Sequence, residues 1–182
     1  FDCDAGFQGN IQYGLIVRDP ERADVSGSNA FETDNDGDGT DASPQTRPIF
    51  SNVTLIGPIG RGTPNADYRR AAHIRRNAAT SLFNTVLTRY PTGLLLDGDA
   101  TARNAQDGTL LIRRTLIAQC DAPLTTNNDI GFDVAAWFNT AGRGNAVQDT
   151  VGDLFAAPIG GIPAYRPRAG SPLLSGAAFT EP

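Results

Sequence analysis

The chain has 182 residues, enough for one domain with a sizeable core, and it carries 20 acidic against 15 basic side chains, a net charge of −5. Such an acidic chain lacks the clustered cations that nucleic acid and anionic membrane surfaces require. The longest aliphatic runs, at 94–96 and 110–112, are far shorter than the roughly 20 residues that cross a bilayer, so neither nucleic-acid binding nor membrane insertion is expected.

Strands are the main predicted elements. In chain order, the strand runs cover residues 11–19, 49–57, 72–78, 82–90, 93–98 and 111–119. They are rich in β-branched and aliphatic residues, and Gly, Pro, Asn or Asp bounds most of them. Several are apolar on nearly every residue, which is typical of parallel strands that are covered on both faces. The sequence therefore predicts an all-β fold.

The spacing of these runs favours a right-handed parallel β-helix, a solenoid with long loops, over a meander of hairpins. Only a Pro-Thr-Gly corner separates the runs at 82–90 and 93–98. Residues 50–58 and 82–91 also resemble each other, and such imperfect repetition is typical of solenoids. Asn52 and Asn84 recur within this repeat, where they either stack at a bend or are unrelated turn residues.

An acidic loop, residues 26–46, follows the first strand run. Three alternating aspartates fill the first three liganding positions of a calcium loop, and a glycine fills the turn position. Gln45 rather than Glu stands at the last position and neither flank is helical, which argues against an EF-hand. Calcium is thus the one cofactor that the sequence indicates. The alternatives are a solvated acidic turn and a loose calcium site formed by Asp34, Asp36, Asp38 and Asp41.

One segment departs from the strand pattern. Residues 127–140 carry Asp129 as a candidate N-cap, followed by apolar side chains near helical spacing, which predicts one short helix near 130–139. The expected organisation is a single domain, with strands and the acidic loop in 1–126 and an irregular terminal coil in 141–182.

The cationic residues are candidates for ligand binding. All 15 basic residues are arginines, and six of them form three adjacent pairs. Successive strand residues face opposite ways, so only one arginine of each pair can point outward unless the backbone bends there, and one alternative is that outward arginines of adjacent coils stack as a strip about 5 Å apart. Arg75 and Arg113 are therefore candidates for binding an acidic glycan. The alternative is pairing with nearby acids, of which the sequence offers Asp97, Asp99 and Asp107.

The single histidine and the two cysteines each leave two alternatives. His73 either assists in a ligand groove, as a binding residue or general acid, or is a hydrogen-bonded strand residue. Cys3 and Cys120 either form a disulfide or stay as buried thiols. No Gly-rich phosphate loop, zinc-type spacing or nucleophile elbow occurs in the sequence, so no catalytic residue is assigned.

Several blocks of the sequence carry a resemblance to a known family. In order, they are FDCDAGFQGNIQYGLIVRDPERADVSGSNAFETDNDGDG, PQTRPIFSNVTLIGP, YRRAAHIRRNAATSLFNTVLTRYPTGLLLDG, FDVAAWFNT and AGSPLLSGAAF. Together they resemble secreted surface proteins of Bacteroidetes and related bacteria. The resemblance implies a right-handed parallel β-helix, often exported by the type IX route, and carries no established reaction. Some such proteins are labelled multidrug transporters, which nothing in these residues supports.

The same resemblance implies that the chain forms the C-terminal coils of a larger solenoid, with an exposed end that further coils or another protein covers. The favoured function is a noncatalytic extracellular or cell-surface module for adhesion, glycan binding or assembly, with the periplasm as the alternative location. Two other functions are alternatives. One is a structural subunit of a larger extracellular or membrane-associated complex, and the other is a calcium-assisted polysaccharide lyase or a glycoside hydrolase.

Overall fold

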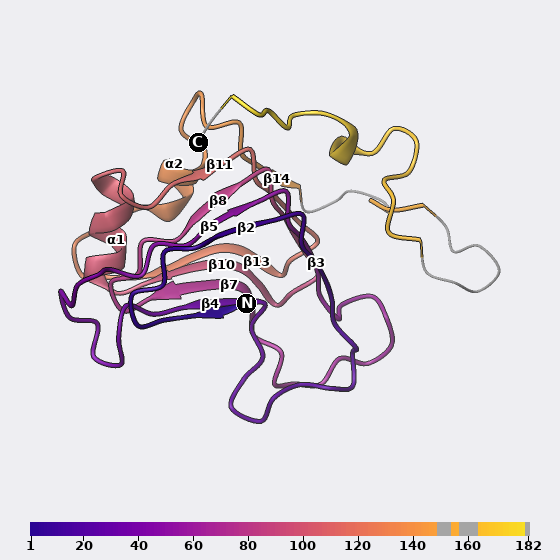
Figure 1. Cartoon of the computed structure of the whole chain (residues 1–182). Coiled ribbons are helices and arrows are strands. Elements are labelled where there is room, and N and C mark those ends of the chain that lie inside the picture. The colour runs from indigo at the N-terminus through magenta and orange to yellow at the C-terminus, as the bar shows by residue number, and fades with distance from the viewer. Residues whose placement is uncertain (149–153, 157–163, 181–182) are drawn as a thin grey trace.

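The computed structural model describes residues 1–148, 154–156 and 164–180, and short parallel strands in three sheets dominate this part of the chain (Figure 1). Sheet A contains, in spatial order, β1 (Asp2–Cys3), β4 (Phe31–Thr33), β7 (Arg70–Arg75), β10 (Thr92–Asp97) and β13 (Ala122–Asn127). Sheet B contains β2 (Asn10–Gln12), β5 (Ile49–Ser51), β8 (Ser81–Phe83) and β11 (Ile112–Arg113). Sheet C contains β3 (Leu15–Val17), β6 (Thr54–Ile56), β9 (Val86–Thr88), β12 (Leu116–Ala118) and β14 (Ala146–Gln148).

Successive strands enter sheets A, B and C in turn. As a result β4, β5 and β6 form one layer, β7 to β9 the next, and β10 to β12 the one after it. Every pair of neighbouring strands is parallel, and Phe31, Ala72 and Leu94 stand in register across three layers. The order of the strands confirms the predicted all-β fold and is compatible with a solenoid.

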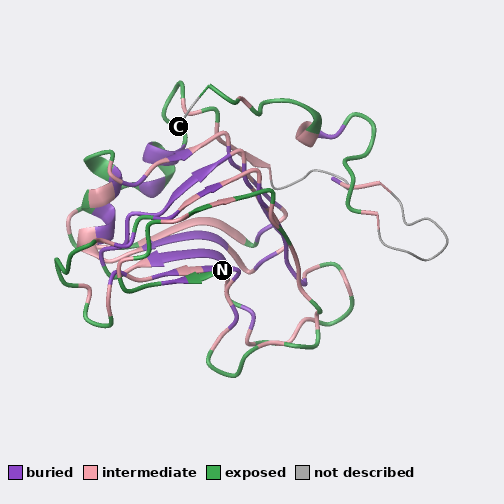
Figure 2. Ribbon diagram, in the orientation of Figure 1, coloured by how far each residue is buried: buried purple, intermediate pink, exposed green. Residues whose placement is uncertain are grey.

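The core lies between the three sheets, where purple marks the buried strand residues in Figure 2. Strand alternation sends one set of side chains inward, and their large members are fully buried. They include Phe31 and Ile74 from sheet A, Phe50 and Leu82 from sheet B, and Leu55 and Leu87 from sheet C. Each such side chain stabilises the fold by about 1.5–3 kcal/mol relative to exposure.

The predicted strands at 11–19, 49–57, 82–90 and 111–119 were too long, because each one is two strands that meet at a corner between sheets B and C. One residue at each corner has a positive φ. These residues, named the corner row, are Tyr13 (φ 59°), Asn52 (φ 56°), Asn84 (φ 49°) and Arg114 (φ 52°). The flanking register places Asn52 and Asn84 in the same column.

The single predicted helix is a second correction, because the described chain has two α-helices and a short 3-10 helix. Helix α1 (Asp99–Gln106) follows β10 and was not predicted. Helix α2 (Val134–Phe138) lies within the predicted helix, but its N-cap is Asp133, not Asp129. Trp137 and Phe138 of α2 are buried in the core, and the Trp137 Nε1–H donates to the Ala105 carbonyl at 2.9 Å.

The terminal stretch 141–182 contains β14, which extends sheet C, and the 3-10 helix η1 (Pro172–Leu174). Residues 149–153, 157–163 and 181–182 of this stretch lie outside the described residues. Within the described ranges, no helix has the length and apolar character needed to cross a lipid bilayer.

Candidate functional site

The outer face of sheet A carries a cluster of charged side chains. Because side chains alternate along a strand, the neighbours of the inward core residues point outward. Glu32 and His73 pair in register across β4 and β7, and Arg75, Asp97 and Asn127 pair across β7, β10 and β13. Asp34 follows β4 directly. We name this cluster the polar face: Glu32, Asp34, His73, Arg75, Asp97 and Asn127.

Arg75 joins two carboxylates of the polar face. Its Nε and Nη2 donate to the two carboxylate oxygens of Asp34 at 2.6 and 3.0 Å, and Nη2 also donates to Glu32 at 2.5 Å. The Arg75 side chain is 25% exposed and that of Asp34 is 13% exposed, so solvent screens the pairs only in part. The hydrogen bond to Asp34 raises the pKa of Arg75, which keeps the guanidinium charged and unable to act as a base.

His73 pairs with Asp97 on the next strand. Its Nε2 lies 2.9 Å from Asp97 Oδ2, and its side chain is only 5% exposed. Burial lowers the pKa of His73 although the hydrogen bond to Asp97 acts in the opposite direction, so the imidazole is neutral at pH 7 and Nε2–H donates to Asp97. Burial opposes ionisation of Asp97, but hydrogen bonds from His73 and Asn127 outweigh it and lower the pKa of Asp97.

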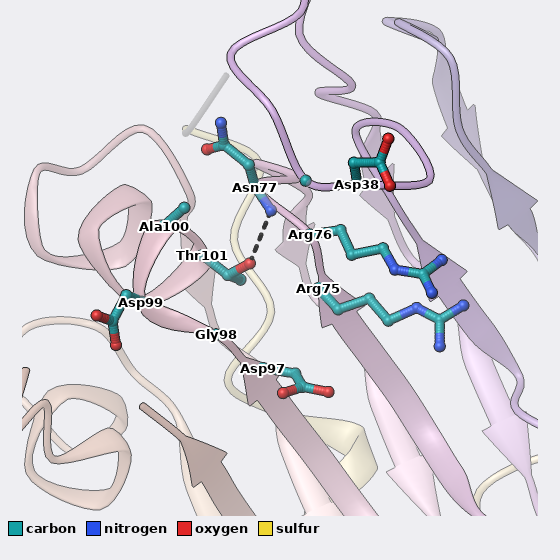
Figure 3. A pocket seen from close by; sticks show the side chains of 10 residues that line it. Asp38, Arg75, Arg76, Asn77, Asp97, Gly98, Asp99, Ala100 and Thr101 are labelled. Carbon is teal, nitrogen blue, oxygen red and sulfur yellow. Dashed lines mark hydrogen bonds between the residues drawn. The ribbon is translucent and has the colours of Figure 1, made fainter. Parts of the chain in front are cut away.

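Two hollows lie beside the polar face. One, of about 400 Å³, lies at the carboxyl ends of β7 and β10, and its lining includes Asp38, Arg76, Asp97 and Thr101. Figure 3 shows Arg75 and Arg76 side by side at the end of β7, with Asp97 on the neighbouring strand. The other hollow, of about 360 Å³, is lined by Ser26, Gly27, Asn29, Glu32, Arg69, Arg70, His73 and Arg75. Arg75 lines both hollows, so the polar face separates them.

The acidic loop does not gather its carboxylates. Asp34 binds Arg75, and Asp41 accepts from the Asn77 side chain at 3.0 Å. Asp36 accepts from the backbone of Asp38 at 2.8 Å and from both the hydroxyl and the backbone of Thr40. The Thr40 hydroxyl is also the main cause of the lowered pKa of Asp36.

The carboxylates of Asp34, Asp36 and Asp41 therefore each bind a different partner, and Asp38 contributes its backbone amide to Asp36. Among the described residues, no three His, Cys, Asp or Glu side chains are grouped so that they could hold a metal ion. Calcium needs several oxygen ligands that converge on one point. The arrangement of Asp34, Asp36, Asp38 and Asp41 does not fit such a site.

Arg75 and Arg113 do not form the arginine strip that was one of the two alternatives. Arg75 and His73 lie on β7 of sheet A, whereas Arg113 lies on β11 of sheet B. The pairs at 75–76 and 113–114 both bend, because Arg76 (φ 49°) and Arg114 have positive φ values. This bend lets Arg76 also reach Asp34, at 3.4 Å.

The predicted pairing of arginine with acids is found, but with other partners. Arg75 binds Glu32 and Asp34, which come from a layer more than 40 residues earlier in the chain. One signal in the sequence could have indicated this contact: Glu32-x-Asp34 and His73-x-Arg75 both alternate, as outward positions of a strand do.

The two cysteines are buried thiols that no disulfide joins. Cys3 lies in β1, the first strand of sheet A, and Cys120 lies two residues before β13, the fifth strand of that sheet. Neighbouring strands lie about 4.8 Å apart. The first and fifth strands of the sheet are therefore separated by far more than the roughly 7 Å between Cα atoms that a disulfide can span. The disulfide alternative is therefore not realised.

The stacked parallel sheets and the outward polar face define an all-β protein of the parallel-strand class. The model of one family, described as a pectate-lyase like beta helix domain, matches residues 1–153. The chain belongs to this family. No curated protein and no solved structure matches the chain.

Proposed function

We propose that the chain is a noncatalytic glycan-binding module, built as a right-handed solenoid and located outside the cell or on its surface. One observation carries this proposal: the charged side chains of the polar face hold one another in place, with an open hollow on either side. A fixed set of carboxylates, amides and guanidinium groups matches the hydroxyl groups of a sugar, which both donate and accept hydrogen bonds. Membership of a pectate-lyase-like family is compatible with a carbohydrate ligand.

The state of the ionisable groups favours binding over catalysis. Proton transfer needs a group whose pKa lies near the working pH and which reaches the substrate. Arg75 is held as a cation by Asp34, and His73 is buried with its Nε2–H directed at Asp97. These contacts position the side chains but leave neither Arg75 nor His73 suited to remove a proton from a sugar.

A glycoside hydrolase or lyase is the second candidate. Asp34, directly after β4, and Asp97, at the end of β10, flank Arg75 of β7, so their backbones are about 10 Å apart. Inverting glycosidases hold two carboxyl groups about 6.5–9.5 Å apart. The general acid of such a pair needs a raised pKa and a proton to give, whereas the pKa of Asp97 is lowered and Asp34 is bound to the Arg75 cation at 2.6 Å. The binding module is therefore the stronger proposal.

Titration calorimetry with a panel of neutral and acidic oligosaccharides tests the proposal. The informative variant is Arg70→Gln, because Arg70 lines the hollow beside His73. The matched control is Arg22→Gln, which removes an arginine that is 87% exposed and lies outside both hollows. We expect binding of at least one acidic oligosaccharide, weakened about fivefold or more by Arg70→Gln and unchanged by Arg22→Gln.

The same mixtures also separate binding from catalysis. After long incubation, the oligosaccharides are analysed by mass spectrometry for shortened or unsaturated products. Unchanged oligosaccharides are expected. If the oligosaccharides are cleaved and Asp97→Asn abolishes the cleavage, the chain is an enzyme rather than a binding module. If no oligosaccharide binds, the proposed glycan ligand is rejected.

A further inference from the structure

A third recess lies on a different face of the molecule, between sheet C and the C-terminal segment, residues 164–180. This segment runs outside the stacked strands (Figure 1). The recess, named the sheet C groove, has a volume of about 460 Å³. Pockets of about 300–1,000 Å³ that combine apolar walls with a few polar groups are typical ligand sites.

The floor of the groove follows from strand register. Thr54, Val86, Leu116 and Ala146 stand in one row across β6, β9, β12 and β14. They point outward, because the residues after them, such as Leu87 and Ile117, fill the core. The floor is therefore a half-buried and largely apolar row that crosses four layers.

The C-terminal segment forms the opposite wall and is held by two residues of the corner row. The Asn84 side chain donates to the Ala178 carbonyl at 2.8 Å and accepts from the Ala178 amide at 3.1 Å. Arg114 donates to the Gly176 carbonyl at 3.4 Å. Tyr165 of the segment also lines the groove and is 37% exposed. The wall is thus fixed in place while an aromatic ring stays accessible.

A smaller hollow of about 170 Å³ continues the groove. Both recesses are lined by Asn52, Asn84 and Arg114, and the smaller one adds Tyr13 and Phe179. Tyr13 and Phe179 are each 75% exposed, which is unusual for large aromatic side chains. Groove and hollow together, named the sheet C strip, follow the corner row from the layer of β2 to that of β11.

Two buried polar atoms in the lining of the groove have no hydrogen-bond partner among the described residues. They are Nε of Arg114 and Oε1 of Gln148, one donor and one acceptor. Buried polar atoms in folded proteins are nearly always paired, so each exception needs an explanation. A ligand in the groove that both donates and accepts would supply the two missing partners.

We propose that the sheet C strip is a second glycan-binding site, which takes a neutral linear oligosaccharide. Sugar rings present C–H groups that pack on aromatic faces, here those of Tyr13, Phe179 and Tyr165. Their hydroxyl groups suit Arg114, Gln148 and the corner amides. None of the described lining residues is acidic and Arg114 is the one charged residue, so the strip has no charge pattern suited to a highly charged ligand.

The geometry also disfavours a peptide that adds as a strand. Strand addition needs an open sheet edge with unpaired backbone groups. The strip lies on the face of sheet C, where the strands β6, β9 and β12 are each paired on both sides. The strip therefore recognises side groups and ring faces rather than backbone, as glycan binding requires.

Calorimetry on the full chain with cellohexaose, mannohexaose and chitohexaose as probes tests this proposal. The informative variant is the double substitution Tyr13→Ala/Phe179→Ala, which removes exposed rings and leaves the core untouched. Phe7→Ala is the matched control, because Phe7 is an exposed aromatic residue (41%) outside the strip. We expect at least one probe to bind, with the double variant weaker by at least about tenfold and Phe7→Ala within about twofold of the parent.

The Arg70→Gln variant, which alters the hollow beside the polar face, separates the two sites. If the strip binds the probe, Arg70→Gln leaves the affinity for that probe unchanged, whether or not the polar face binds a glycan of its own. If Arg70→Gln weakens binding and the double variant does not, the strip proposal falls and the polar-face proposal stands. Failure of all three probes to bind also overturns the strip. Thermal unfolding of each variant confirms that it is folded before it is compared.

Discussion

Arg75 links β7 to the neighbouring layer, because its guanidinium binds the carboxylates of Glu32 in β4 and of Asp34 directly after β4. In Arg75→Gln the partly buried carboxylate of Glu32 loses its cation, and that of Asp34 keeps only the longer contact to Arg76 at 3.4 Å. We expect the free energy of unfolding to fall by about 1–3 kcal/mol, measured by urea denaturation.

Arg75→Lys is the control for charge alone. Lysine keeps the positive charge but lacks the planar fork that binds Asp34 through two nitrogen atoms, so its stability is expected to lie between the parent and Arg75→Gln. Equal stability of Arg75→Gln and the parent would show that the network adds nothing to the fold.

His73 gives the molecule a sensitivity to mild acid. Its pKa in the folded protein is lowered, mainly by burial, from the ordinary value of 6.5. The unfolded chain therefore binds a proton at a higher pH than the folded chain, and stability is lost as the pH falls below that value. We expect His73→Gln to reduce the fall in melting temperature between about pH 7.5 and 5.

The charged groups around His73 are Glu32 on β4, Asp97 on β10, and Arg70 and Arg75 on β7 itself. The pKa of Asp97 is also lowered, so its own contribution is lost only in stronger acid, below its ordinary value of 3.8. Parallel melting curves for the parent and His73→Gln would contradict the assignment of the mild-acid effect to His73.

At the scale of elements, helix α2 depends on a single capping side chain. The Asp133 carboxylate accepts from the amides of both Ala135 and Ala136 at 2.9 Å, and so satisfies two donors that the helix cannot pair itself. Asp133→Ala is expected to cost about 1 kcal/mol and to lower the melting temperature by about 2–4 °C.

Asp129→Ala is the matched control, because Asp129 is exposed and lies outside the helix. Its effect is expected to stay within about 0.5 kcal/mol. A larger loss of stability for Asp129→Ala than for Asp133→Ala would show that Asp129 is the N-cap, as the sequence alone predicted.

The sequence located most strand regions, but not where they bend. Asn52 and Asn84 are residues that tolerate a positive φ, and their repetition indicated a bend. Tyr13 and Arg114 also adopt a positive φ, although their residue types do not favour it, because stacking on the neighbouring layers determines the backbone conformation there. Helix α1 escaped prediction since it buries only Thr101, Ala102 and Ala105 and has no large apolar stripe.

The candidate site was predictable only in part for a related reason. His73 and Arg75 stand out by residue type, yet their partners depend on which layers become neighbours. Asp97 is 24 positions from His73 and Asp34 is 41 positions from Arg75. Pattern within one strand shows which way a side chain points. It does not show which strand comes to lie beside it.

At the scale of the whole molecule, layers near the middle of the stack are more deeply buried than those at its ends. Strands β7 and β10 are buried at four consecutive positions, whereas β2, β3 and β14 have no buried residue. Stability in stacked architectures depends on contacts with adjacent layers, so end layers are expected to open first.

Hydrogen exchange measured by mass spectrometry tests this gradient. We expect amides of β7 to β10 to exchange most slowly and those of β2, β3 and β14 to exchange faster, in order of distance from the middle. Uniform protection along the stack would instead show that the layers unfold as one cooperative unit.

The corner row also makes the molecule a scaffold for redesign. Its four positions accept side chains as different as those of Tyr13, Asn52 and Arg114, and successive positions are one layer apart, about 4.8 Å. New side chains placed there would leave the hydrophobic interior unchanged. A row of imidazoles or carboxylates along this edge would offer ligands at regular intervals. Metal ions or a growing mineral surface would bind to it as to a template with atomic-scale spacing.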